Sequence, residues 1–150
     1  MKAEYVNIFI EATYDIFYSL LNTQIQKKSL YCKENSTTTY DITSSMYIHG
    51  DIALTILLSC QTQLLINITN EILNTDKYKI DSDVVDAGGE ILNIIVGRAK
   101  KVFREKKHIS FKIGLPEVVV GRNHSLKLNG KFLGVTFFAY NMFFALEFSV

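Results

Sequence analysis

The chain has 150 residues, of which 48% are hydrophobic and 21% charged, and its 16 basic and 15 acidic side chains leave a formal net charge of +1. This length and composition are typical of one ordered globular domain, and they exclude a disordered chain or one that needs metal or disulfide cross-links to fold. The balanced charge also argues against a nucleic-acid partner. We therefore expect a single domain over residues 1–150.

The first half of the chain predicts alternating helices and strands. Apolar residues at helical spacing predict an amphipathic helix over residues 3–22. Residues 26–45 are polar and rich in threonine, which fits a strand followed by a surface loop. A hairpin is expected over residues 47–59, because Gly50-Asp51 suits a tight turn between two β-favouring runs. Helical spacing returns over residues 61–74.

The second half predicts one long helix followed by strands. Asp81-Ser82-Asp83 can cap the start of this helix, which then continues to about Lys106. The β-favouring runs that follow cover residues 108–115, 116–121, 125–128, 131–139 and 142–150. In the last run Phe144, Leu146, Phe148 and Val150 share one face, and Phe143, Ala145, Glu147 and Ser149 share the other. This order of elements predicts an α/β sandwich with helices packed on a largely antiparallel sheet.

The sequence gives no sign of export or of a membrane span. The N-terminal segment carries Glu4 and is amphipathic, whereas an export signal has a continuous apolar core. The apolar stretch over residues 135–146 is too short for a bilayer-spanning helix and contains Tyr140-Asn141, where we expect a turn. We therefore expect a cytoplasmic protein that does not contact a membrane.

The cysteine and histidine residues do not predict a metal or redox centre. Cys32 and Cys60 are too far apart in sequence for a zinc-ligand pair or a short redox motif, so we expect inert thiols. His49, His108 and His124 lack the spacing of metal ligands on a helix or hairpin. No metal site is expected.

The long helix separates into two faces when each residue is advanced by about 100°. The apolar face contains Val84, Gly88, Leu92, Ile95, Ala99 and Val102. The polar face contains Asp86, Glu90, Asn93 and Gly97. Glu90 and Asn93 are three residues apart and are therefore neighbours on the helix surface. Gly97, one turn beyond Asn93, removes a side chain that would block an approaching partner.

A structural explanation competes with a functional one, because glutamate and asparagine are common on the polar face of any amphipathic helix. The glycines of this helix favour the functional explanation. Gly88, Gly89 and Gly97 each lower helix stability by about 1 kcal/mol relative to alanine, so they suggest that another group approaches the helix closely.

This helix resembles the signature helix of the CheC/CheX family of chemotaxis phosphatases, which has an Asp, then Gly-Glu, two residues, Asn, three residues and Gly. The matching positions are Asp86, Gly89, Glu90, Asn93 and Gly97. Residues 50–54 and 115–121 are also similar to segments of the family. CheC proteins carry two Glu-x-x-Asn sites, but here Glu11 is followed by Tyr14 where the asparagine would be. The resemblance is therefore closest to CheX, with one site per chain.

The resemblance implies a CheC-like fold and hydrolysis of the aspartyl phosphate on a CheY-like response-regulator receiver. It implies that Asn93 orients the attacking water and that Glu90 contacts the receiver, with Asp86, Gly89 and Gly97 at partner-binding positions. It also implies that the chain has no cofactor of its own and that Mg²⁺ is bound by the receiver. Finally, it implies a homodimer joined through sheet edges. The apolar closing strand fits either such an edge or the core.

Two other functions are compatible with the sequence. One is a non-catalytic module of the same fold, either a receiver-binding adaptor or a relative of flagellar-switch domains. The presence of both Glu90 and Asn93 argues against it. The other is a small-ligand-binding domain, which requires a cavity lined by convergent polar groups.

Overall fold

The computed structural model describes residues 1–34, 37–126 and 128–150, and it contains helices and strands in the predicted order. The helices are α1 (Ala3–Leu21), α2 (Thr62–Leu73) and α3 (Ser82–Val102), and α3 continues into a short π-helical turn, η1 (Phe103–Lys107). The strands are β1 (Gln26–Lys33), β2 (Ile42–Gly50), β3 (Leu54–Cys60), β4 (Phe111–Ile113), β5 (Glu117–Val120), β6 (Phe132–Ala139) and β7 (Met142–Ser149).

The strands form one antiparallel sheet in the order β1-β6-β7-β3-β2-β4, and β5 also pairs with β2. This architecture confirms the predicted fold class, an α/β sandwich on a largely antiparallel sheet. β7 lies between β6 and β3, so the closing strand belongs to the interior of the sheet and is not an edge. The edges are β1 on one side and the short strands β4 and β5 on the other.

Most helix and strand boundaries agree with the predictions to within a few residues. The exception is residues 125–128, where the expected strand is reduced to an isolated bridge between Ser125 and Thr37, and where Lys127 lies outside the described residues. The apolar stretch 135–146 forms the β6–β7 hairpin, with Tyr140 and Asn141 at its turn. None of the helices formed by the described residues is long and apolar enough to cross a membrane.

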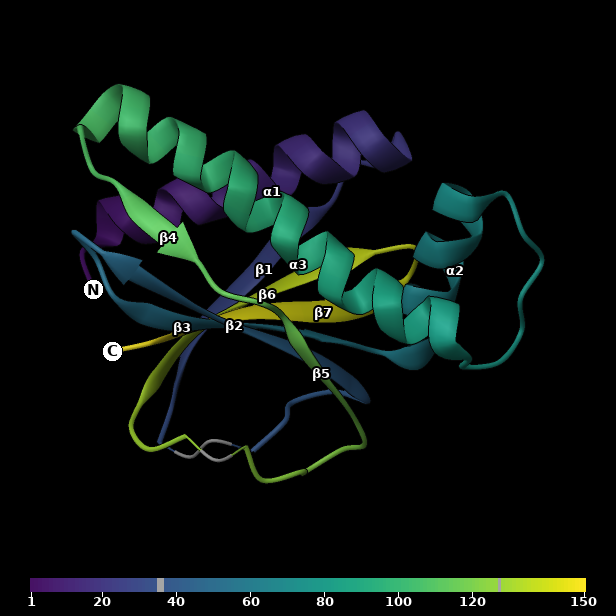
Figure 1. Ribbon diagram of the computed structural model, residues 1–150. Helices are drawn as coiled ribbons and strands as arrows, with labels where there is room; N and C mark the ends of the chain where they lie inside the picture. Colours follow the sequence, from purple (N-terminus) through teal and green to yellow (C-terminus); the bar gives the residue numbers. More distant parts are fainter. Residues whose placement is uncertain (35–36, 127) are drawn as a thin grey trace.

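The helices cover one face of the sheet (Figure 1). The side chains buried between the helices and this face form a core rich in aromatic residues. Phe144 of β7 is central to this core: its ring stacks on Phe17 of α1 and on Phe137 of β6, with centroids 4.8 and 5.0 Å apart. Nearer the end of α3, Phe103 contacts Phe9 of α1 and Phe111 of β4. These contacts anchor the C-terminal end of α3 to both the sheet and α1.

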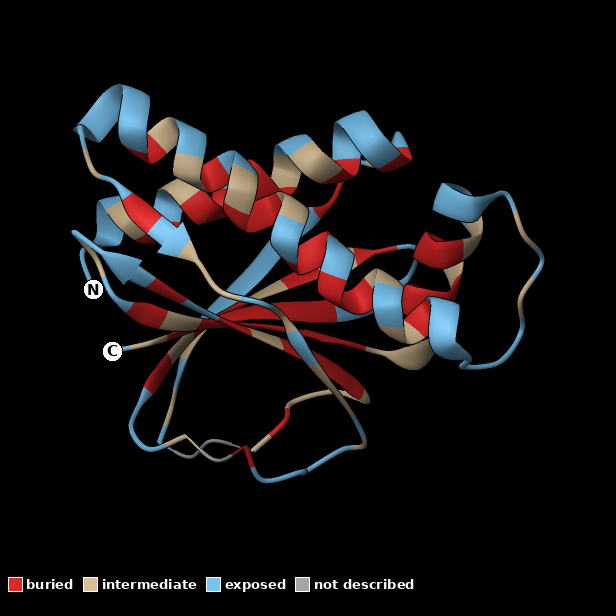
Figure 2. Cartoon of the chain, in the orientation of Figure 1, coloured by how far each residue is buried: buried red, intermediate tan, exposed pale blue. Residues whose placement is uncertain are grey.

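The opposite face of the sheet is also buried in its middle, because residues 37–41, before β2, and residues 121–126, after β5, lie against it (Figures 1 and 2). Leu57, Leu126 and Phe132 form a small second apolar cluster there. The two faces of β7 are therefore both largely buried, which its simple alternation of residues does not reveal. Cys60 of β3 is buried, and burial raises the pKa of its thiol to about 12, whereas Cys32 is exposed.

Glu147 of β7 lies on this second face with 0% of its surface exposed. Its carboxylate accepts hydrogen bonds from the Tyr31 hydroxyl at 2.5 Å, from the Lys33 ammonium at 2.6 Å and from the Thr39 hydroxyl. Tyr31 pairs with Gly134 on β6, and Gly134 pairs with Glu147, so the tyrosine ring crosses β6. A Cβ atom at Gly134 would lie 2.2 Å from that ring. Burial and the adjacent carboxylate raise the pKa of Tyr31 above its usual range.

Candidate functional site: the exposed face of helix α3

Helix α3 begins at a well-formed cap. The Asp81 carboxylate accepts a hydrogen bond from the backbone N–H of Val84 at 3.0 Å, as an N-cap residue does. The Lys77 ammonium lies 2.5 Å from Asp81 and 3.0 Å from Asp83. These contacts lower the pKa of Asp81, chiefly through the hydrogen bond from Lys77 and then the one from Val84. The first turn of α3 is therefore fixed to the segment that precedes it.

One face of α3 packs on the sheet and its neighbouring helices. Val84, Leu92, Ile95 and Ala99 are fully buried, as the periodicity predicts. Val102, assigned to the same face, is only half-buried. This packing fixes the rotation of the helix about its axis, and the rotation determines which side chains face solvent.

The outward face carries the predicted polar residues. The side chains of Asp86, Glu90 and Asn93 are exposed, and Gly97 is half-buried. Within the described part of the chain, these three side chains have no hydrogen-bond or ion-pair partner. A Cβ atom at Gly97 would have no atom within 4 Å. The helix therefore presents a free carboxylate and a free carboxamide beside an open position.

Gly88 and Gly89 have a different environment from Gly97. Both are buried, and a Cβ atom at Gly88 would lie 3.0 Å from the Ser44 hydroxyl and 3.2 Å from a Leu65 methyl group. A Cβ atom at Gly89 would lie 3.2 Å from the ring of Pro116. At Gly88 and Gly89, the groups that approach the helix closely are therefore side chains of the same chain and not those of a partner. Of the residues predicted to bind a partner, Gly89 can contribute only through its packing on Pro116.

Pro116 has no predicted role of its own, although it is the single proline of the chain. It lies between β4 and β5, against the middle of α3. Its uniqueness was the signal that could have indicated a rigid point next to the helix, because proline fixes its own φ angle and restricts the residue before it.

Helix α1 does not carry a second pair of the same kind. Glu11 is exposed, but Tyr14, three residues on, packs edge-on against Phe137 of β6 at 6.0 Å. The Tyr14 oxygen also accepts a hydrogen bond from the backbone N–H of Lys27. Glu11 therefore has an aromatic side chain of the core as its neighbour in place of a carboxamide.

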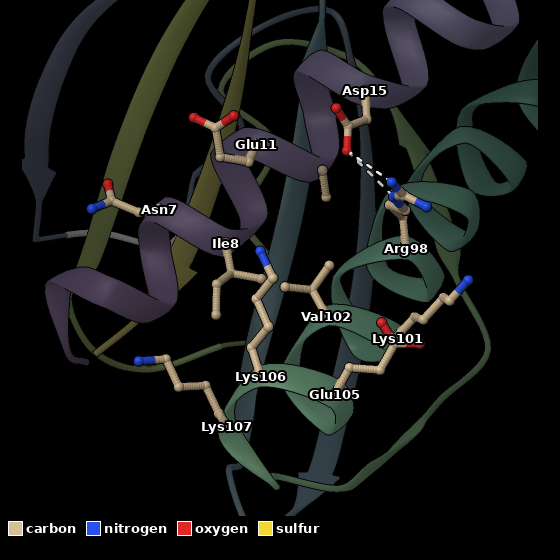
Figure 3. Close-up of a pocket in the computed structure, with 11 residues that line it drawn as sticks. Asn7, Ile8, Glu11, Asp15, Arg98, Lys101, Val102, Glu105, Lys106 and Lys107 are labelled. Carbon is tan, nitrogen blue, oxygen red and sulfur yellow. Dashed lines mark hydrogen bonds and ion pairs between the residues drawn. The ribbon is translucent and has the colours of Figure 1, made fainter.

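A groove of about 510 Å³ lies on the surface between α1 and the C-terminal half of α3 (Figure 3). Glu11 and Asp15 line it from α1, and Arg98, Lys101 and Lys106 line it from α3 and η1. Arg98 donates to the Asp15 carboxylate at 3.2 Å across one end of the groove. Glu90 and Asn93 do not line it. The candidate site is thus an exposed helix surface. The reacting group of a substrate must therefore lie in a pocket of the substrate molecule itself.

The described residues contain no group of three or more His, Cys, Asp or Glu side chains that could hold a metal ion. The exposed pair itself offers one carboxylate and one carboxamide. A carboxylate accepts hydrogen bonds from cations, and a carboxamide both donates and accepts. The site is therefore equipped to hold a water molecule and a positively charged partner group.

A sequence model of the chemotaxis phosphatase CheX matches residues 42–138 of this chain. No match was found among curated proteins. A crystal structure of a CheX chemotaxis protein from Desulfovibrio desulfuricans has 25% sequence identity and a TM-score of 0.83, with 97% of each chain covered. A CheC-like superfamily protein from Shewanella sp. PV-4 has 22% identity and a TM-score of 0.87, with 99% of this chain and 98% of that chain covered.

A third similar structure is a complex of two proteins with bound ions. It is a CheX–CheY–BeF₃–Mg²⁺ complex from Borrelia burgdorferi, with 16% identity to this chain, a TM-score of 0.81, and coverage of 99% of this chain and 98% of that chain. The match to the CheX sequence model covers well over half of the chain and includes both the α3 face and the β2–β3 hairpin. It confirms the family suggested by the signature helix, and with it the prediction of a phosphatase: the chain belongs to the CheX family of chemotaxis phosphatases.

Proposed function

We propose that this protein hydrolyses the aspartyl phosphate of a CheY-type receiver, with Asn93 orienting the attacking water and Glu90 contacting the receiver. The observation that carries the proposal is the pair of unpartnered, outward-facing side chains on one rigid helix. Membership of the CheX family supports the reaction. The complex of a Borrelia burgdorferi CheX with CheY supports the choice of partner.

An aspartyl phosphate is a mixed anhydride and is already activated, so catalysis consists mainly of placing water in line with the phosphorus. The water oxygen forms a bond to phosphorus, and the bond from phosphorus to the aspartate oxygen breaks. The products are dihydrogen phosphate, which keeps both protons of the water, and a free aspartate carboxylate. The Asn93 carboxamide is not a base at neutral pH, but its C=O and NH₂ groups can hold the water by hydrogen bonds.

Glu90 lies one helical turn from Asn93 and carries the negative charge of the pair. We assign it a charge-assisted contact with a lysine of the receiver near the phosphoryl group. This contact would fix the register in which the receiver meets the helix. Asp86 and Gly97 would lie on either side of this contact. Gly89 would contribute indirectly, because its packing on Pro116 holds the helix in position.

Magnesium enters the proposal with the receiver, where it would neutralise charge on the phosphoryl oxygens. The Mg²⁺ in the Borrelia burgdorferi complex supports this part of the proposal. The proposal also places the protein in the cytoplasm, where chemotaxis receivers act. A homodimer joined at sheet edges is its last element, and β1 is the longer of the free edges available for it.

The test is the decay of a ³²P-phosphorylated CheY-type receiver. Wild-type protein should accelerate phosphate release, and Asn93→Ala should lower kcat by about a hundredfold or more, because the water loses its orienting group. Receiver binding should largely survive. Asn7→Ala is the matched control, since Asn7 is exposed on α1.

Glu90→Ala should weaken receiver binding and lower turnover, whereas Glu11→Ala should leave both nearly unchanged. Equal losses from the two glutamate variants would contradict a single site on α3. If wild-type protein binds the phosphorylated receiver without accelerating its decay, the chain is a receiver-binding adaptor and the catalytic proposal is wrong.

A further inference from the structure

Leu115 is an apolar side chain held in solvent at the edge of the sheet. It is 90% exposed, the largest exposed fraction of any large hydrophobic side chain among the described residues. It lies in the link between β4 and β5, two short strands that both pair with β2. Packing inside the monomer gives no reason for a leucine at this position.

The backbone on both sides of Leu115 is held in place. The N–H of Gly114 donates to the carbonyl oxygen of Tyr47 at 2.9 Å, and a Cβ atom at Gly114 would lie 2.8 Å from that same oxygen. On the other side, the Pro116 ring packs against Gly89 of α3. Proline also restricts the conformation of the residue before it, which is Leu115. Little backbone entropy would therefore be lost if Leu115 bound a partner.

This segment is adjacent to the candidate site. Gly89 and Asn93 are four residues apart on α3, so they are neighbours on the same side of the helix. Pro116 thus contacts the helix one turn from Asn93, and Leu115 directly precedes Pro116. The exposed Leu115 is therefore connected to the exposed face of α3 through the contact between Pro116 and Gly89.

A partner that closes over Glu90 and Asn93 must cover more than these two side chains. A specific protein–protein interface buries about 800 Å² on each partner, which is the area of 20 or more residues. Such a footprint extends from α3 to the elements beside it. On the side of Asn93 the adjacent element is the segment that contains Leu115.

We infer that Leu115 is an apolar anchor for the receiver, inserting into an apolar depression on the receiver surface next to its phosphorylated aspartate. This inference rests on the proposed function, because it takes the same partner and the same face of α3. Leu115 acts in binding and does not touch the reacting atoms. It therefore sets the affinity for the receiver, while Asn93 sets the rate of hydrolysis.

The test measures KM and kcat for dephosphorylation, and Kd for the same receiver bound to BeF₃ and Mg²⁺. Leu115→Ala should raise both KM and Kd about tenfold, since truncating a leucine that becomes buried loses about that factor in affinity. Its kcat should match the wild-type value. Leu115→Met should restore most of the affinity, because methionine keeps a similar apolar volume. Melting temperatures should be unchanged, because the side chain is almost fully exposed.

Leu20→Ala is the matched control, since Leu20 is 44% exposed near the C-terminal end of α1. It should leave KM and Kd at wild-type values. If Leu115→Ala leaves KM and Kd unchanged in an active protein, the anchor is refuted while the phosphatase proposal survives. A loss confined to kcat would also refute it. If wild-type protein neither binds the receiver nor accelerates its decay, the proposed function itself fails.

Discussion

Gly97 gives a sharp test of whether the exposed face of α3 is a docking surface. It lies inside a helix, where glycine is about 1 kcal/mol less favourable than alanine. A Cβ atom at this position would meet no other atom within 4 Å. Gly97→Ala should therefore stabilise the protein by about 1 kcal/mol, which corresponds to a rise of about 2–4 °C in melting temperature for a domain of this size. Fold stability alone would favour a side chain here.

Binding of a partner against this face would instead favour glycine at position 97, because any side chain there would occupy space that the partner needs. Gly97→Leu should keep most of the gain in stability, yet lower kcat/KM for the phosphorylated receiver at least about tenfold, because its side chain occupies the space that the receiver needs. Thermal or urea unfolding gives the stability, and receiver decay gives the activity. A Gly97→Leu protein with wild-type turnover would refute the docking role.

Gly88→Ala is the control variant, because Gly88 is a helix glycine that is packed against other residues of the fold and does not face solvent. Its new methyl group would press on Ser44 and Leu65, which are both buried and have little room to move. Overpacking of this kind costs about 1–3 kcal/mol, more than the gain in helix propensity. Gly88→Ala should therefore lower the melting temperature, in contrast to Gly97→Ala.

Two further predictions concern stability. Glu147→Leu should lower the free energy of unfolding in urea by about 3–5 kcal/mol, because it leaves the Lys33 ammonium without its buried carboxylate; an unchanged unfolding midpoint would show that the ion pair contributes nothing. The lowered pKa of Asp81 means that its carboxylate stabilises the fold above the ordinary aspartate pKa of 3.8 and loses this effect as the pH falls through the lower folded value. The difference in melting temperature between wild type and Asp81→Ala should accordingly be present at pH 7 and shrink below pH 3.8, and a constant difference would contradict a stabilising role of the charged Asp81 carboxylate with Lys77 and Val84.

The sequence predicted the faces of α3 well, because helical periodicity is a local property. Val84, Leu92 and Ile95 repeat at the spacing of a buried stripe, so the outward placement of Glu90 and Asn93 follows from rotation about one axis. The distinct environments of the three glycines could not be predicted in this way. Gly88 and Gly89 meet side chains from β2, α2 and the β4–β5 link, which periodicity along α3 does not contain.

The burial of Glu147 on the second face of the sheet also could not be predicted from local sequence patterns. Glu147 alternates with apolar residues in β7, a pattern that commonly places a charge in solvent. Its partners Tyr31, Lys33 and Thr39 precede it by more than 100 residues and come from a region with weak periodicity. Only the folded topology brings that region over the middle of the sheet.

The crossing of Tyr31 over Gly134 has an evolutionary consequence. The tyrosine reaches Glu147 only because the strand between them has a backbone without a side chain at that point. A substitution at Gly134 is therefore acceptable only after Tyr31 has been lost, and Glu147 then loses one of its donors. Among descendants of this protein we expect Tyr31 to be replaced before Gly134, and Glu147 to be replaced after Tyr31. Replacement of only one of the three should be rare.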